Sequence, residues 1–227
     1  MRIVLFDIDG TLIRAGQASK RAIEVAFTTV FGVTPTFTGV EFHGSTDPLI
    51  TQAIVRRTLE REITRAEGAE LTRLYLAHLG TEVARESNYE VLPGVPELIR
   101  TLAERDEILL GLQTGNIEGA VPHKLSRAGL HGAFSFGGYG SDSAEREMIV
   151  HTAIERAVHR AGRRHARPEH VIVIGDTPRD VVAGQAWGAT TIAVATGIYP
   201  LDELAATGAT LATPTLAEAA VRHALLA

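Results

Sequence analysis

The stretch IVLFDIDGTL at residues 3–12 begins with four apolar residues and then changes at once to two acids and a glycine. A short apolar run bounded in this way is typical of a buried strand, so we expect a strand from Ile3 to Phe6. Two similar runs follow at residues 108–112 and 171–174, and segments with helical spacing separate the three runs. Strands that alternate with helices predict an α/β fold, in which helices cover both faces of a parallel sheet.

A helical block interrupts this alternation between residues 15 and 89. Apolar side chains recur every three or four residues from Ala18 to Phe31, which predicts an amphipathic helix. Thr46 and Thr64 are placed to cap two further helices, and the block contains no strand pattern. We therefore expect a Rossmann-like parallel-sheet core with an inserted helical cap, the core formed by residues 1–14 and 90–227 and the cap by residues 15–89.

Two interpretations concern the second half of the core. Residues 133–136 are expected to form a short strand, and the glycine-rich residues 137–140 a flexible loop. Helical spacing also predicts a helix from about Ile117 to Ala128. Lys124 is expected to face solvent on that helix.

Composition and charge narrow the class of protein. The 227 residues include 22 lysines and arginines, 27 aspartates and glutamates, and no cysteine. The net charge of −5 argues against a nucleic-acid-binding protein, which usually presents a strongly basic face. Without cysteine there is no disulfide, no thiolate metal site and no cysteine nucleophile. No signal-peptide pattern or apolar run of about 18 residues is found. We expect a cytoplasmic protein, monomeric or homodimeric, that binds no nucleic acid and no membrane.

Polar side chains follow three of the predicted strands. Asp7 and Asp9 follow the first, Thr114 ends the second, and Asp176 follows the third. Asp7 and Asp9 stand two residues apart, so both side chains point to the same side of an extended chain. Because ligands bind beyond the carboxyl ends of parallel strands, we expect the three ends to meet in one site. The candidate residues are Asp7, Asp9, Gly10, Thr114, Gly115, Asn116, Asp176 and Asp180.

These residue types suit metal-assisted phosphate chemistry. Four gathered carboxylates would repel one another unless a cation lay between them, and Mg²⁺ prefers carboxylate oxygens, waters and substrate phosphate. One carboxylate could then attack phosphorus while a neighbour exchanges protons with the leaving group and with water. The Thr114 hydroxyl and the N–H groups of Gly115 and Asn116 suit phosphate oxygens. Taken one at a time, however, such residues are as well explained by turns and helix caps.

Three segments together resemble the motifs of the haloacid dehalogenase-like hydrolase superfamily. Residues 7–12, DIDGTL, are similar to its first motif, DxDGTL, while residues 109–114 resemble its second motif and residues 171–180 its fourth, GDxxxD. The helical insertion resembles a C1-type cap, and the whole pattern is most similar to the phosphoglycolate phosphatase-like branch. The resemblance implies a Mg²⁺-dependent phosphatase that hydrolyses a small-molecule phosphate monoester, a small phosphorylated metabolite, through an aspartyl-phosphate.

The same resemblance implies a role for each residue. Asp7 would be the nucleophile and a metal ligand, and Asp9 the general acid and base, which also offers its backbone carbonyl to Mg²⁺. Thr114 would bind the transferring phosphate, with Gly10, Gly115 and Asn116 beside it. Asp176 would be a metal ligand and Asp180 a second one. Because the dehalogenases of the superfamily typically lack an acid two residues after the nucleophile, Asp9 favours phosphate esters as substrates.

One motif departs from the family pattern. The third motif usually supplies a lysine, and residues 140–160 contain none. Arg146 is the best substitute, because a guanidinium can bridge the nucleophile and a phosphate oxygen; the alternative is that Arg146 is an exposed helix residue. Lys124 is a less favoured substitute. His43, in a glycine-containing loop that enters the cap, either binds a polar part of the substrate or stands in a turn.

Three other functions stay open. A sugar-phosphate mutase of the β-phosphoglucomutase kind would use the same nucleophile but protect its phosphoenzyme from water. A phospho-acceptor module like a response-regulator receiver also uses a strand-end aspartate, but the chain length, the helical block and the missing lysine argue against it. A catalytically silent binding relative is argued against by the intact acids Asp7, Asp9, Asp176 and Asp180.

Overall fold

A six-stranded parallel sheet lies at the centre of the protein. The computed structural model describes residues 1–163 and 166–226. In the order β5-β4-β1-β6-β7-β8, every strand pairs parallel to its neighbours. The strands are β1 (Arg2–Phe6), β4 (Ile108–Thr114), β5 (Gly137–Tyr139), β6 (Val171–Gly175), β7 (Thr190–Val194) and β8 (Leu211–Thr213). The predicted α/β fold is confirmed, and β1 lies between the two strands that carry the other motifs.

Helices cover both faces of this sheet. Because alternate side chains of a strand point in opposite directions, each strand contributes to the core on both faces. In β1, Val4 and Phe6 belong to one core cluster, which includes side chains of α4 and α9. Ile3 and Leu5 belong to another, which includes side chains of α6 and α7. Burial on both faces explains why β1 is continuously apolar. The helices are α4 (Val95–Ala103), α6 (Arg146–Arg160), α7 (Pro178–Ala186), α8 (Leu201–Ala206) and α9 (Ala219–Leu226).

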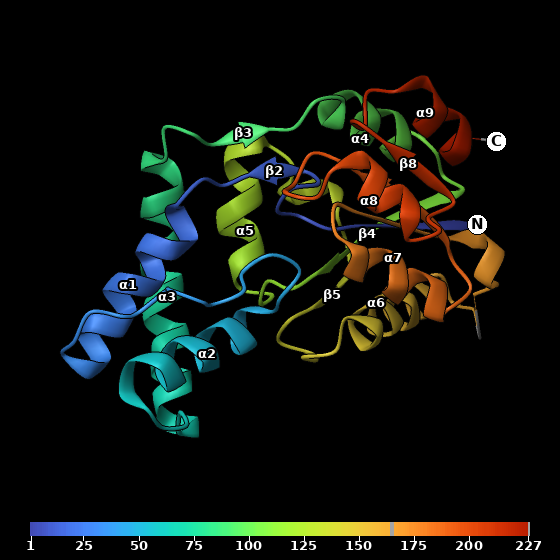
Figure 1. The fold of residues 1–227 in the computed structure, drawn as a ribbon. Coiled ribbons are helices and arrows are strands. Elements are labelled where there is room, and N and C mark those ends of the chain that lie inside the picture. The colour runs from blue at the N-terminus through green and yellow to red at the C-terminus, as the bar shows by residue number, and fades with distance from the viewer. Residues whose placement is uncertain (164–165, 227) are drawn as a thin grey trace.

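Three further helices lie together at one end of the molecule (Figure 1). Their facing side chains form a core cluster of their own, which includes Phe27, Ile54 and Leu79. A two-stranded antiparallel ribbon connects them to the sheet region. The helices are α1 (Ala18–Phe31), α2 (Asp47–Leu59) and α3 (Arg65–Arg85), and the ribbon consists of β2 (Ile13–Arg14) and β3 (Glu90–Val91).

The ends of these three helices agree with the sequence signals. Gly32 ends α1 in the left-handed region at φ 72°, where a side chain would be strained. The Thr46 and Thr64 hydroxyls accept backbone N–H groups in the first turns of α2 and α3. Local chemistry thus fixes where these helices begin and end.

The glycine-rich segment after residue 136 is a strand and not a flexible loop. The strand predicted at residues 133–136 is wrong, because a 3-10 turn occupies His131–Ala133 and β5 begins only at Gly137. A Cβ atom on Gly138 would lie 1.9 Å from the carbonyl oxygen of Ile149 in α6. Glycine is therefore required by the close packing of α6 on β5, a tertiary cause that local sequence patterns do not reveal.

Two other stretches differ from expectation. The helix predicted from Ile117 begins later, as α5 (Ala120–Leu125), and a 3-10 turn at Ser126–Ala128 follows it. The short elements α8 and β8 carry too few residues for a periodic pattern, and sequence analysis did not find them.

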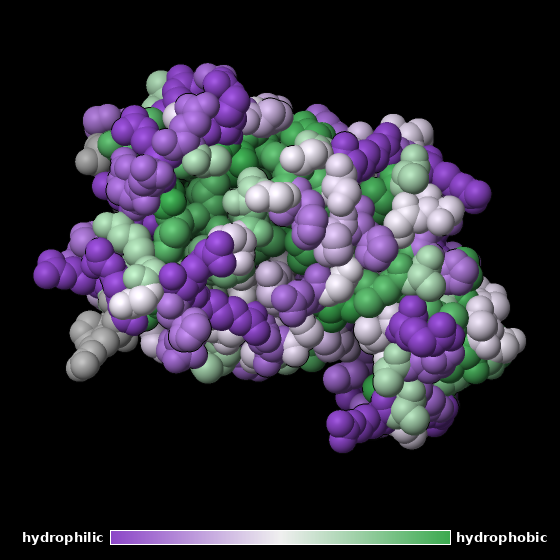
Figure 2. All heavy atoms as spheres, turned by 180° about the vertical axis from the view of Figure 1, so that it is seen from behind, coloured by the Kyte–Doolittle hydropathy of each residue, from purple (hydrophilic) through white to green (hydrophobic). Residues whose placement is uncertain are grey.

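The surface seen in Figure 2 is mainly hydrophilic toward the edges of the molecule. Seen from behind, polar and charged residues cover most of the outer parts, and apolar side chains show between them toward the middle of the molecule (Figure 2). Of the helices in the described part of the chain, none combines the length and apolar character that crossing a membrane requires.

Candidate active site

The predicted strand ends meet at one edge of the sheet. Because β4, β1 and β6 are adjacent and parallel, their carboxyl ends open into the same pocket, which has a volume of about 490 Å³. A pocket of this size suits a small-molecule ligand. The predicted residues that line it are Asp7, Asp9, Gly10, His43, Thr114, Gly115, Asn116, Arg146 and Asp176. Asp180 is fully buried beneath them, in contact with Arg146.

Three buried carboxylates form a cluster, and two of them line this pocket. One oxygen from each of Asp7, Asp176 and Asp180 lies within 4.8 Å of the others. Burial raises the pKa of Asp176 to about 9, with Asp7 and Asp180 adding to the effect. Burial likewise raises the pKa of Asp7 to about 6, although Arg146 opposes the shift. When all three acids are ionised, Arg146 balances only one of their charges, so the oxygen donors and the remaining negative charge fit a hard divalent cation.

Arg146 joins two members of this cluster. Its Nη2 lies 3.0 Å from Asp7 Oδ1 and 2.6 Å from Asp180 Oδ1, and its Nε donates to the same Asp180 oxygen at 3.0 Å. The side chain is buried, so the alternative that Arg146 is an exposed helix residue is wrong. The guanidinium therefore lies where a cation can act on Asp7 and on a phosphate next to it.

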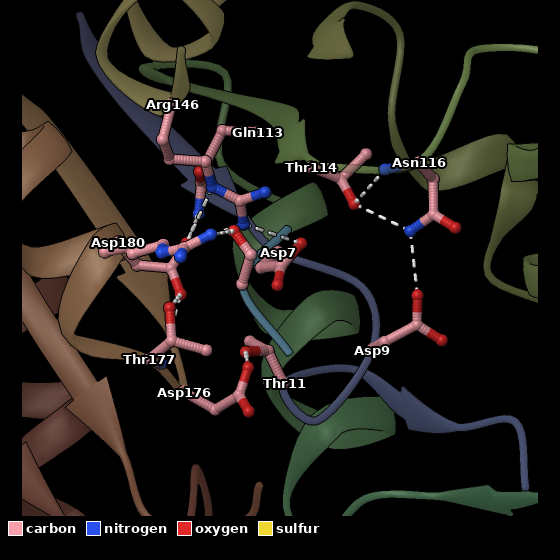
Figure 3. A network of polar contacts seen from close by, with 12 residues as sticks. Asp7, Asp9, Thr11, Gln113, Thr114, Asn116, Arg146, Asp176, Thr177 and Asp180 are labelled. Carbon is pink, nitrogen blue, oxygen red and sulfur yellow. Dashed lines mark hydrogen bonds and ion pairs between the residues drawn. The ribbon is translucent and has the colours of Figure 1, made fainter. Parts of the chain in front are cut away.

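Asp180 is surrounded by hydrogen-bond donors. Besides Arg146, its carboxylate accepts from Gln113 Nε2 at 3.0 Å and from the Thr177 backbone N at 3.1 Å and hydroxyl at 2.7 Å. Together these donors use both oxygens of the group. Asp180 thus fixes the direction of the Arg146 side chain and the first turn of α7, in addition to its place in the carboxylate cluster (Figure 3).

Asp9 lies apart from the three-carboxylate cluster (Figure 3). Its side chain is 42% exposed. Its Oδ2 accepts hydrogen bonds from Asn116 Nδ2 at 2.8 Å and from Lys124 Nζ at 2.6 Å. Asn116 Nδ2 also donates to Thr114 Oγ1 at 2.8 Å. The ends of β1 and β4 are therefore linked through one short polar network.

The expectation that Lys124 faces solvent is wrong. The side chain is 4% exposed and points from α5 to Asp9. A signal was available, because Ala120 and Val121 are buried and stand four and three residues before Lys124, on the same face of the helix. A lysine on an apolar helix face requires a partner for its charge, which here is Asp9.

Glycines allow the chain to pass close to Asp176. At Gly10, φ is +85° and a Cβ atom would lie 2.3 Å from Asp176 Oδ2. At Gly197, just after β7, a Cβ atom would lie 1.8 Å from the same oxygen. Gly10 therefore shapes the site through its missing side chain, and Gly197 is a site residue that no sequence motif indicated.

The helix α2 contacts the loop that follows β4. The Asp47 backbone N donates to the Gly115 carbonyl at 2.8 Å, and Asp47 Oδ2 accepts from the Ile117 backbone N at 2.9 Å. A Cβ atom on Gly115 would lie 2.1 Å from the Ser45 carbonyl oxygen. His43 is exposed and lines the pocket from the loop before α2. The segment before α2 thus forms one wall of the pocket.

Comparison with known proteins identifies a family and a curated relative. The family model for haloacid dehalogenase-like hydrolases matches residues 1–188. Phosphoglycolate phosphatase from Synechococcus elongatus is 28% identical over 213 residues, which cover 91% of this chain and 89% of that protein.

Solved structures share the fold over nearly the full length. CbbY from Rhodobacter sphaeroides, in complex with phosphate, has a TM-score of 0.76 at 20% identity and covers 100% of both chains. A predicted phosphoglycolate phosphatase from Haemophilus somnus has a TM-score of 0.70 at 19% identity, over 96% of this chain and 95% of that one. At these identities the two structures show a shared fold.

Proposed function

Since the chain belongs to the haloacid dehalogenase-like hydrolase family, we propose that this enzyme hydrolyses a small-molecule phosphate monoester with the help of Mg²⁺. The observation that carries the proposal is the different placement of two neighbouring acids. Asp7 lies in the carboxylate cluster beside Arg146, and Asp9 lies outside the cluster, half exposed to the pocket. One acid is thus available for attack on phosphorus and the other for proton transfer.

The reaction has two displacements at phosphorus. In the first, an Asp7 carboxylate oxygen forms a bond to phosphorus while the bond to the ester oxygen breaks, and Asp9 gives its proton to that departing oxygen. In the second, Asp9 takes a proton from a water molecule whose oxygen attacks the aspartyl-phosphate. Phosphate leaves and the Asp7 carboxylate is restored. Splitting one difficult displacement in this way lowers the barrier of each step.

The residues around Asp7 would bind the transferring phosphate. The Arg146 guanidinium, which already contacts Asp7, supplies positive charge to the phosphate oxygens. The Thr114 hydroxyl lies at the end of β4 and the Gly115 N–H follows it, while the Asn116 N–H donates to Thr114 Oγ1 at 3.3 Å and so helps to orient that hydroxyl. Donors that are fixed before the substrate arrives stabilise developing charge without reorganisation.

Mg²⁺ would bind at the buried carboxylates. Asp7 and Asp176 supply side-chain oxygens and Asp9 its backbone carbonyl, while Asp180, whose oxygens already accept several hydrogen bonds, is the more remote ligand. When bound, the ion withdraws charge from the phosphate oxygens and shields the negatively charged nucleophile from them. The donor set consists of carboxylate and carbonyl oxygens, which favours Mg²⁺ over softer metals.

The helical segment of residues 15–89 would act as a cap that selects the substrate, with residues 1–14 and 90–227 as the catalytic core. This division is supported by the separate core cluster of α1, α2 and α3 and by the contribution of His43 and Ser45 to the pocket wall. A small phosphorylated metabolite fits the pocket volume. The cysteine-free composition suits the reducing conditions of the cytoplasm, where we expect the enzyme to meet such a substrate. 2-Phosphoglycolate is the first substrate to test, because the Synechococcus relative is a phosphoglycolate phosphatase.

Phosphate release measures this function directly. The enzyme should release inorganic phosphate from p-nitrophenyl phosphate and from one or more phosphorylated metabolites in the presence of Mg²⁺, and EDTA should abolish the activity. Asp7→Asn should abolish it with unchanged thermal unfolding, while Asp202→Asn, an exposed acid in α8, serves as the matched control. Activity of Asp7→Asn equal to that of the wild type would contradict the proposal. Conversion of a sugar phosphate to its isomer without phosphate release would favour a mutase.

A further inference from the structure

We propose that Lys124 is a positioning residue for Asp9, and that it holds the Asp9 carboxylate ready to accept a proton from the water that hydrolyses the aspartyl-phosphate. This inference rests on the proposed phosphatase function and assigns a role to a residue that the family motifs leave aside. It starts from an ion pair between a buried ammonium and a carboxylate that is open to the pocket.

Both donors to the Asp9 side chain bind the same oxygen. Asn116 Nδ2 and Lys124 Nζ lie 2.8 and 2.6 Å from Oδ2, and among the described residues no side-chain hydrogen bond reaches Oδ1. A carboxylate oxygen that already accepts two hydrogen bonds is a poor place for a proton, so Oδ1 is the oxygen left to carry one. Oδ1 then remains as the oxygen that can receive the proton of a water molecule.

Lys124 is itself held firmly in place. Its side chain is buried, and the residue lies in the last turn of α5. The Tyr89 hydroxyl donates to the Lys124 backbone carbonyl at 2.7 Å, which fixes the helix at this residue. A half-exposed aspartate at a strand end would otherwise sample several rotamers. A buried, fixed donor restricts Asp9 to one orientation, and orientation is a major part of general-base efficiency.

The surroundings of Lys124 explain why a lysine is tolerated there. Its ammonium lies near a second acid, Asp47, and lowers the pKa of that group against the raising effect of burial. The ammonium thus has a carboxylate on the core side and another on the cap side. A lone buried lysine would be costly, whereas one between two acids has its charge balanced.

The second displacement leaves Lys124 chemically unchanged. As the water oxygen bonds to phosphorus, one of its protons moves to Asp9 Oδ1, and the bond between phosphorus and the Asp7 oxygen breaks with its electron pair returning to Asp7. Lys124 keeps its three protons throughout and acts only through Asp9. Losing Lys124 should therefore slow the second displacement more than the first, at least for a substrate whose leaving group departs without help.

Pre-steady-state kinetics with p-nitrophenyl phosphate test this, because p-nitrophenol needs little protonation to leave. Lys124→Met keeps the length of the apolar stem. It should lower kcat at least about tenfold, as part of the 10²–10⁴-fold that general acid–base catalysis contributes. It should change kcat/KM by less than about threefold, since kcat/KM reports only the steps up to the first irreversible one. A burst of p-nitrophenol approaching one per active site should precede the slow turnover.

Three comparisons make the test specific. Lys124→Arg, which keeps a donor and a charge, should restore part of kcat. In Asp9→Asn, adding Lys124→Met should lower kcat no further, because the lysine acts through Asp9. Arg156→Met is the matched control, since it removes a partly buried cation from an ion pair, with Asp142, that lies outside the pocket. It should give no burst even if it lowers thermal stability.

The possible outcomes separate this inference from the proposed function. If the wild type releases neither p-nitrophenol nor phosphate, both the phosphatase function and the role of Lys124 fail. If the wild type turns over and Lys124→Met lowers kcat and kcat/KM equally without a burst, only the positioning role fails. A rise in KM confined to 2-phosphoglycolate, with no burst, would show instead that Lys124 binds a substrate carboxylate.

Discussion

Metal affinity should depend steeply on pH, because the proposed metal ligands must lose protons before they can bind a cation. In the metal-free protein, burial and the neighbouring acids raise the pKa of Asp176 to about 9 and that of Asp7 to about 6. Between pH 7 and pH 8, Asp176 therefore carries a proton and Asp7 is mostly ionised. Binding of Mg²⁺ in this range must release about one proton.

The magnitude follows from that single proton. Each pH unit below the pKa of Asp176 costs the bound state about 1.4 kcal/mol, a factor of about ten in affinity. The Mg²⁺ association constant should thus rise about tenfold from pH 7 to pH 8. Below pH 6 the slope should steepen, because Asp7 then begins to hold a proton as well. Above about pH 9 the affinity should level off.

Isothermal titration calorimetry measures both quantities. Titrations with MgCl₂ at pH 7 and pH 8 give the two affinities. Repeating them in Tris and MOPS, whose ionisation enthalpies differ, gives the number of protons released. A Mg²⁺ affinity that is flat between pH 7 and pH 8, with a binding enthalpy independent of the buffer, would refute the reasoning that Asp176 is a protonated ligand.

Three other predictions follow from the same site. The folded-state pKa of Asp176 lies above its ordinary value of 3.8. The contribution of Asp176 to the free energy of unfolding is therefore fully present below about pH 4 and is lost as the pH rises toward 9. The melting temperature of the metal-free protein should fall over this range, and Mg²⁺ should raise it more at pH 8 than at pH 6. Arg146→Met should lower kcat/KM for p-nitrophenyl phosphate about 10²–10³-fold by removing charge beside the nucleophile, whereas Arg156→Met, which breaks an ion pair away from the pocket, should leave it within about threefold. Gly10→Ala should lower the melting temperature and weaken Mg²⁺ binding, because the new Cβ would meet Asp176; Gly32→Ala, which has a similar φ and an open surrounding, should cost only the backbone strain of about 1 kcal/mol and leave Mg²⁺ binding unchanged.

The sequence predicted the architecture well where local chemistry decides it. The runs before Asp7 and Asp176 are apolar because both faces of their strands are buried, and a fully buried strand has a recognisable pattern. Thr46 and Thr64 cap their helices through hydrogen bonds within three residues, so these boundaries can be read from neighbouring positions.

Features that depend on tertiary packing were missed. The glycines of β5 indicate flexibility when considered locally, and only the approach of the Ile149 carbonyl from α6 shows why they form a strand. Gly197 is required by Asp176, which stands more than twenty residues earlier in the chain. Such requirements arise between distant residues and leave no periodic signal.

The acids and Thr114 of the candidate site were predicted from strand ends. Two neighbouring strands fix where Asp7 and Thr114 must be, because parallel strands share a carboxyl edge. Lys124 was missed because its charge suggested a solvated residue, although its position on α5 is an apolar one. The polar partner that makes it tolerable, Asp9, is 115 positions away.

The proposed reaction requires that Asp7, assisted by a metal at the buried carboxylates, becomes phosphorylated during turnover. Rapid acid quenching of the enzyme with a phosphate-labelled substrate, followed by proteolysis and mass spectrometry, locates the label. We expect a labile phosphoryl group on the peptide that contains Asp7, present with Mg²⁺ and absent after EDTA treatment. Turnover with label on no peptide, or label retained in Asp7→Asn, would contradict it.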